Sequence, residues 1–119
     1  MVTWGVHWAG GVCSPANPGY TAEELAFQLA DSGAKGLVTQ LALLETAAAA
    51  AGRAGIPPER IVLLGDERDP GGKYKHFTQL LGATSLFAPA RPRIDPREDV
   101  CFLVYSSVCC WQEADGATV

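Results

Sequence analysis

Hydrophobic residues between positions 20 and 64 follow two alternating periods, and this alternation constrains the fold more than any other feature. Apolar side chains recur every three or four positions over residues 21–32 and 41–54, which predicts two helices. Short continuous apolar runs at 36–39 and 61–64 are typical of strands, the second of a strand covered on both faces. Such alternation favours parallel strands joined by right-handed crossovers.

The first of these helices carries the clearest local signals. Thr21 is a good N-cap, and Glu24, three residues later, completes a capping box. Tyr20 and Leu25 occupy the positions of a hydrophobic staple on either side of the cap. Gly33 stands where a helix ends in a left-handed residue, so we expect the helix to stop at Ser32.

Weaker signals flank this region on both sides. We predict a helix over residues 2–9, with Trp4 and Trp8 on one face, and a strand over 12–14. After a polar loop at 66–75 come at most two helical turns at 77–81, an extended Pro-rich stretch at 88–96 and a strand at 100–105. The predicted fold class is therefore α/β. We expect a partial Rossmann-like βαβαβ layer of parallel strands flanked by helices, which is an incomplete domain.

Composition excludes several classes of function. The 119 residues allow one domain, and 48% hydrophobic with 18% charged residues is typical of a globular chain. A net charge of −4 without a Lys/Arg cluster argues against a nucleic-acid partner. No apolar run is long enough to span a membrane, and the N-terminus is not a secretory signal. We therefore expect a cytoplasmic protein.

Cysteine, histidine and carboxylate residues form no recognisable catalytic or metal pattern. The four cysteines lack zinc spacing, so we interpret them as buried or incidental thiols. His7 and His76 are the candidate neutral-pH bases, but a lone histidine beside an aromatic residue more often packs or meets solvent. The carboxylates at 95, 98 and 99 read as a solvated turn. We predict no catalytic residue and no metal ligand.

Two sequence blocks carry a resemblance to a known family. Residues 10–40 read GGVCSPANPGYTAEELAFQLADSGAKGLVTQ, and residues 99–107 read DVCFLVYSS. The first block is similar to the phrase GG…PANP.YT..EL…L.DS.AK.LVT of adenylate-forming enzymes, the AMP-dependent synthetase/ligase superfamily. Within it, the 4-coumarate–CoA ligase-like acyl-CoA synthetases look most similar. The resemblance covers residues 1–107 and identifies them as part of the N-terminal AMP-binding domain.

The second block leads toward the family's phosphate loop. In the family this strand runs into Ser-Ser-Gly-Thr-Thr-Gly-x-Pro-Lys-Gly, so the resemblance implies that Ser106 and Ser107 begin that loop and contact the cofactor. Here residues 108–119 read VCCWQEADGATV instead. Val108 lacks the conformational freedom of glycine, the two cysteines do not replace threonine donors, and no lysine follows. We interpret 108–119 as an unrelated, disordered tail that interrupts the loop.

Function follows from the resemblance only in part. Family members use ATP and Mg²⁺ to convert a carboxylic acid into an acyl-adenylate, and then transfer the acyl group to CoA. Their adenine-, acid- and CoA-binding motifs come after the phosphate loop. We therefore expect a truncated, inactive portion of an ATP-dependent acyl- or aryl-CoA ligase that binds none of these cofactors. A stand-alone noncatalytic α/β module that binds a partner or a nucleotide is the alternative, and an active enzyme is the least favoured interpretation.

Two further hypotheses concern the tail and the strands. A splice donor read as coding sequence would explain the change of register at Val108, because valine codons begin with GT, and the cDNA sequence after the Ser107 codon tests this. The apolar strands at 61–64 and 100–105 would leave exposed edges in a chain without the family's neighbouring elements. We therefore expect self-association through these edges.

Overall fold

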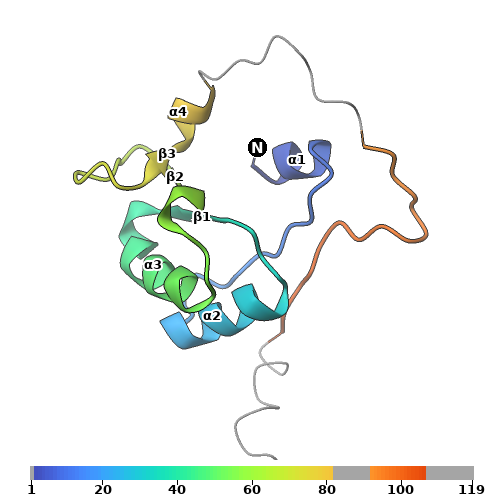
Figure 1. Ribbon diagram of the computed structural model, residues 1–119, viewed down its shortest axis with the longest axis horizontal. Helices are drawn as coiled ribbons and strands as arrows, with labels where there is room; N and C mark the ends of the chain where they lie inside the picture. The colour runs from blue at the N-terminus through green and yellow to red at the C-terminus, as the bar shows by residue number, and fades with distance from the viewer. Residues whose placement is uncertain (1, 82–91, 107–119) are drawn as a thin grey trace, which may run out of the picture. The chain divides into compact units, whose positions relative to one another are not determined.

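The computed structural model describes residues 2–81 and 92–106 of the chain (Figure 1). The chain divides into two compact units. One comprises Asn17–Thr84, and the other combines Met1–Ala16 with Ser85–Val119. None of the helices among the described residues is long and apolar enough to cross a membrane.

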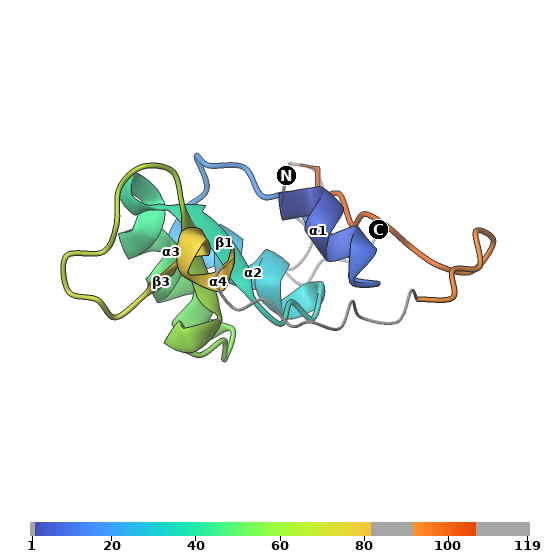
Figure 2. The ribbon, with the colours of Figure 1, turned by 90° about the horizontal axis from the view of Figure 1, so that it is seen from above.

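The Asn17–Thr84 unit has the predicted α/β character. Its elements are α2 (Ala22–Asp31), β1 (Leu37–Gln40), the 3-10 helix η1 (Leu41–Leu43), α3 (Leu44–Arg53), the 3-10 helix η2 (Pro58–Arg60), β2 (Ile61–Leu64), β3 (Lys75–His76) and α4 (Phe77–Leu81). Helices α2 and α3 pack against each other, and α3 also contacts β1 (Figures 1 and 2). The expectation of an α/β layer of parallel strands flanked by helices is confirmed.

The three strands form one parallel sheet in the order β1-β2-β3. Leu37 pairs with Ile61 and Gln40 with Leu64, so β1 and β2 end together. The sequence does not predict strand β3, because it reads as loop over residues 66–75. The two residues of β3, Lys75 and His76, are polar and form no apolar run. On β2, Ile61 and Leu63 are buried whereas Val62 and Leu64 are half-buried, so the described residues cover one face fully and the other in part.

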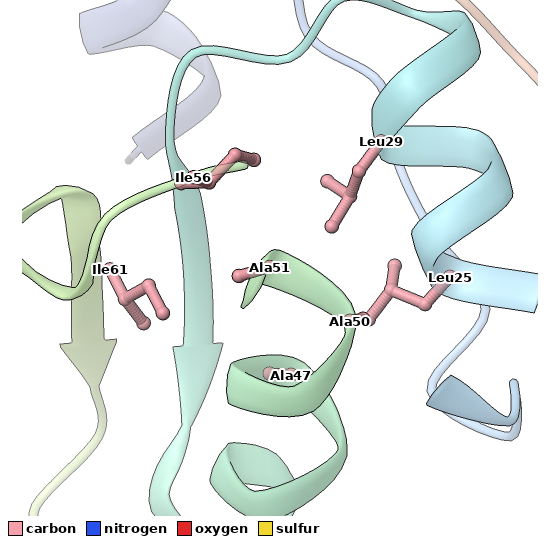
Figure 3. Packing of buried hydrophobic residues seen from close by; sticks show 7 residues of the cluster. All are labelled: Leu25, Leu29, Ala47, Ala50, Ala51, Ile56 and Ile61. Carbon is pink, nitrogen blue, oxygen red and sulfur yellow. The ribbon is translucent and has the colours of Figure 1, made fainter. Parts of the chain in front are cut away.

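The hydrophobic core lies between the two helices and the sheet. In Figure 3 Leu25 and Leu29 of α2 point toward the alanine face of α3, whose Ala50 and Ala51 are fully buried. Alanines let the two helices approach closely while the leucines fill the space between them. Ile61 extends the same cluster onto β2.

A capping box begins α2, and a left-handed glycine follows the C-terminal end of both α2 and α3. The Thr21 hydroxyl accepts a hydrogen bond from the Glu24 N–H at 3.3 Å, and the Glu24 carboxylate accepts from the Thr21 N–H at 2.7 Å, which confirms the capping box. Gly33 and Gly55 have φ of 63° and 74°. Each follows its helix as the left-handed residue of a Schellman turn, in which the next N–H donates to a carbonyl five residues back.

The second predicted helix, 41–54, is divided. Its first turn is the 3-10 helix η1, and α3 begins only at Leu44. Leu43 adopts φ −106° and ψ 3°, which is outside the α-helical region. Gln40 precedes η1 without a side-chain cap, so this helix start lacks the signal that Thr21 gives α2.

The other unit contains α1 (Val2–Trp8) and a single parallel bridge between Cys13 and Phe102. The helix confirms the prediction for residues 2–9, but the prediction of a strand at 100–105 is wrong. A parallel ladder would continue with an N–H at position 15 donating to the Leu103 carbonyl, and Pro15 has no N–H. The Ser14 hydroxyl donates to the Leu103 carbonyl instead, at 3.0 Å, and pairing ends after one bridge.

Candidate functional site

Ser106, the first of the two residues that the resemblance assigns to the phosphate loop, follows the extended 100–105 segment. Ser106 is exposed there. Ser107 and residues 108–119 lie outside the described residues, so the predicted interruption of the loop and the predicted disorder of the tail are both untested. Ser106 thus stays a predicted contact to a nucleotide.

The structure brings the two resembling sequence blocks together at this segment. The Cys13 N–H donates to the Cys101 carbonyl at 3.0 Å, and the Leu103 N–H donates to the Cys13 carbonyl at 2.9 Å. Because the two segments run parallel, Pro15 and Ser106 leave the bridge at the same end. Two motifs almost ninety residues apart in sequence are therefore neighbours in space.

Helix α1 places an aromatic cluster in the same unit. His7 packs edge-on against Phe102, with ring centroids 4.8 Å apart and planes at 81°. Its Nδ1 lies 3.2 Å from the Gly11 carbonyl oxygen and donates to it, whereas the buried Nε2 has no hydrogen-bond partner among the described residues. A cavity of about 380 Å³ beside it is lined by Trp4, His7, Trp8, Pro92 and Ile94. His7 is thus a packing residue, as its neighbourhood to Trp8 suggested.

A second cavity, of about 450 Å³, lies at the carboxyl ends of β1 and β2. Ligands of open parallel sheets bind outside this edge, and the volume is within the usual range for small-molecule sites. Sequence reasoning missed it, although the polar residue that ends β1, Gln40, and the two that follow β2, Asp66 and Glu67, are the available signal. Its lining comes from the turn into η1 and the turn after β2: Gln40, Leu41, Ala42, Leu64, Gly65, Asp66 and Glu67.

His76 bonds to Gly65, one of the residues that line this cavity. It is only 4% exposed, and both ring nitrogens are bonded. Nε2 lies 2.8 Å from the Gly65 carbonyl oxygen, to which it donates, and Nδ1 lies 2.8 Å from the Thr78 hydroxyl. The ring therefore ties the turn after β2 to the first turn of α4. This confirms the packing interpretation of His76.

The loop between β2 and β3 is organised by one carboxylate. Asp69 accepts backbone N–H groups from Tyr74 at 3.1 Å, from Gly71 at 3.0 Å and from Lys73 at 2.8 Å. These donors, Tyr74 foremost and then Gly71, hold the pKa of Asp69 below its ordinary value of 3.8. The carboxylate is thus structural, because its oxygens are already occupied by the loop's own backbone.

The lining of the cavity at the ends of β1 and β2 does not fit a nucleoside triphosphate. The larger cavity is lined by Asp66 and Glu67 and by no lysine, arginine or hydroxyl side chain, so its charge repels phosphate. In the described part of the chain, no three His, Cys, Asp or Glu residues gather closely enough to hold a metal ion. Cys101 is exposed and Cys13 half-buried, so neither of these two thiols is fully buried.

Comparison with known proteins decides the family. The family model described as AMP-binding enzyme matches residues 1–107. The chain belongs to the AMP-binding enzyme family. This confirms the adenylate-forming superfamily to which the PANPGYT and DVCFLVYSS blocks pointed. A search of curated proteins found no match for the chain.

Proposed function

We propose that the chain is a portion of an ATP-dependent acyl- or aryl-CoA ligase of the 4-coumarate–CoA ligase type, and that it does not itself adenylate a carboxylic acid. One observation supports the proposal: the family match covers residues 1–107, and the next residues, VCCWQEADGATV, contain no lysine and have no glycine or threonine at the positions where the phosphate loop has them. We further propose that residues 108–119 lie outside the AMP-binding domain.

The physical argument concerns what holds phosphate. Such a loop binds because glycines let successive N–H groups converge on phosphate oxygens while a lysine adds charge. Ser106 and Ser107 supply at most two hydroxyl donors, which is a small part of that set. In the family, ATP and Mg²⁺ are used to adenylate the carboxylic acid, and CoA accepts the acyl group as a thioester. We propose that this chain binds none of the three.

The direct test is carboxylate-dependent exchange of pyrophosphate into ATP. We expect the purified chain to show none with 4-coumarate or with fatty acids, in the presence of Mg²⁺. Exchange above the rate of a no-carboxylate control would contradict the proposed inactivity. Sequencing the cDNA tests whether residues 108–119 are an intron read as coding sequence. A transcript in which Gly-Thr-Thr-Gly codons follow the Ser107 codon supports this hypothesis, and a single uninterrupted transcript overturns it.

A repaired chain tests the role of the loop. Replacing residues 108–115 with Gly-Thr-Thr-Gly-Thr-Pro-Lys-Gly should restore weak ATP binding, measured by equilibrium dialysis against the unchanged chain. The matched control carries the same loop with Ser106→Ala, which removes the hydroxyl that we assign to phosphate contact. Equal ATP binding by the repaired chain and by this control would show that the Ser106 hydroxyl does not contact phosphate.

A noncatalytic binding module is the second candidate, and the 450 Å³ cavity at the ends of β1 and β2 favours it. Its two carboxylates select an uncharged or cationic ligand over a phosphate. In an amide NMR titration, we expect adenosine to shift the Ala42 and Gly65 signals and AMP to shift them less. Stronger shifts with AMP would show that charge at Asp66 and Glu67 does not govern the site.

A further inference from the structure

The segment 100–104 exposes more contiguous apolar surface than any other stretch of backbone that the structure describes as extended. The exposed fractions of Val100, Phe102, Leu103 and Val104 are 54%, 45%, 36% and 75%. Residues 100–106, VCFLVYS, carry no charge, no proline and no glycine. Short segments of this composition have a strong tendency to pair with other strands when they are exposed.

Among the described residues, the backbone of this segment is paired on one edge only. Cys13 bonds to the peptide groups of Cys101 and Leu103. Peptide groups of alternate residues point to opposite edges of a strand, so those of Phe102 and Val104 face away from Cys13. No backbone hydrogen bond joins Phe102 or Val104 to any other described residue. Four donors and acceptors are therefore aligned on an open edge.

We propose that a second copy of the chain adds its own 100–104 segment to this edge, antiparallel. The pairing places Phe102 opposite Val104 of the second copy and Val104 opposite its Phe102. Leu103 faces Leu103 of the second copy at the two-fold axis. The same surface is used on both chains, so the contact is closed and symmetric. This goes beyond the proposed function and does not depend on it.

Charge selects the direction of the pairing. Asp99 immediately precedes the segment. Parallel pairing in register would set Asp99 beside Asp99 of the second copy, and like charges directly opposite are destabilising. Antiparallel pairing places the two carboxylates at opposite ends of the paired strands. An uncharged, self-complementary strand of this kind fits an identical strand better than it fits a charged partner.

The edge of strand β1 is less suited to this role. Strand β1 is one of the two outer strands of the described sheet, β3 being the other, and it pairs with β2 there. Two of its four residues, Thr39 and Gln40, are polar, and Val38 is its one exposed large apolar side chain. Pairing at β1 would bury little apolar area, so we place the contact at 100–104.

Sedimentation velocity of the full chain in reducing buffer tests the contact. We expect a monomer–dimer equilibrium, and we expect Val104→Lys to raise the dissociation constant about tenfold, because it changes two cross-strand pairs at once. Leu81→Lys is the matched control: it is 68% exposed, lies on α4 and should leave the constant unchanged. A chain that stays monomeric, or an equal effect of both variants, would overturn the proposal.

A proline variant distinguishes backbone strand pairing from nonspecific hydrophobic association. Val104→Pro keeps an apolar side chain but removes the outward N–H, so we expect it to weaken the dimer as Val104→Lys does. Its far-UV circular dichroism should match that of the parent chain, because Val104 makes no backbone bond within the described residues. Unchanged dimerisation by this variant would contradict strand pairing.

Cross-linking tests the register. In a background with all four cysteines replaced by serine, Leu103→Cys places two thiols face to face across the axis, and oxidised glutathione should trap a dimer. Val100→Cys is the control, because antiparallel pairing separates the two copies of position 100. Efficient cross-linking at 100, or none at 103 while the dimer forms, would overturn the antiparallel register.

Discussion

At the scale of single residues, two carboxylates stabilise local backbone by accepting hydrogen bonds from backbone N–H groups. Glu24 closes the N-terminus of α2, and Asp69 closes the loop before β3. The Thr21 N–H, and then the Thr21 hydroxyl, lower the pKa of Glu24 below its ordinary value of 4.5. Glu24 is exposed and Asp69 is only partly buried, so both carboxylates order local backbone more than they stabilise the core.

Removing the cap should destabilise α2. We expect Thr21→Ala to lower the free energy of unfolding by about 1 kcal/mol, because the Glu24 N–H loses its acceptor. The pKa of Glu24 should rise only partway toward 4.5, since the Thr21 N–H still donates to it. Urea titration and carboxyl-carbon NMR measure the two effects. Thr21→Ser keeps the hydroxyl and should change neither; a matching loss with serine would contradict the capping role.

Acid should release the Asp69 loop. A carboxyl whose folded pKa is lowered contributes stability above its unfolded pKa, and this contribution is lost as the pH falls through the folded value. We therefore expect the amide signals of Gly71, Lys73 and Tyr74 to titrate together below pH 3.8, the ordinary pKa of Asp69. Asp69→Asn should abolish this shared transition in NMR spectra, and its persistence in the variant would assign it to another group.

At the scale of elements, glycines end the helices and alanines let them approach. Gly33 and Gly55 are left-handed, and the residue after each returns a hydrogen bond to its helix. Leu25 and Leu29 meet the alanine face of α3, and an ion pair of 3.2 Å between Arg53 and Glu23 joins the same two helices at the surface. The exposed ion pair contributes little beside this packing.

Gly52, inside α3, and Gly55, just past its end, should respond oppositely to alanine. Gly55→Ala forces a side chain into the left-handed region and should cost about 1–2 kcal/mol, although no atom obstructs the new methyl group. Gly52→Ala, inside the same helix and equally unobstructed, should stabilise the chain by about 0.5–1 kcal/mol. Thermal melts of the pair measure both. A stabilising Gly55→Ala would contradict the left-handed helix end.

At the scale of the whole molecule, the two units differ in how they are held. The Asn17–Thr84 unit has a buried cluster and a three-stranded sheet. In the described part of the other unit, the contacts between the two sequence segments include one bridge, a side-chain hydrogen bond and the His7–Phe102 contact. The exposed apolar surface of residues 100–104 is the surface that the proposed dimer would use.

Hydrogen exchange should report this difference. We expect the slowest amides on β2 and the fastest along 100–104, where Leu103 alone donates to Cys13. The Phe102 and Val104 amides should exchange freely in dilute solution and become protected as the concentration rises. Protection of these two amides in dilute monomer would show a ladder that the structure lacks.

Local sequence signals predicted most of the α/β unit. Thr21, Glu24 and Gly33 mark helix ends through bonds within a few residues, and the run at 61–64 marks a strand by its apolar character alone. The sequence did not predict strand β3, because Lys75 and His76 form a strand only through their pairing with β2. The sequence did not predict the cavity at the ends of β1 and β2, because the two stretches that line it are more than twenty residues apart.

The sequence by itself determined the family blocks, the helix caps and the parallel α/β order, because each depends on neighbours in the chain or on apolar period. Tertiary structure alone decided that Cys13 meets Phe102, that His76 bonds to Gly65, and that 100–105 is not a strand. The last case shows the reason. Val100 to Val104 have the composition of a strand, but a strand exists only where a partner offers a ladder, and Pro15 ends that ladder after one bridge.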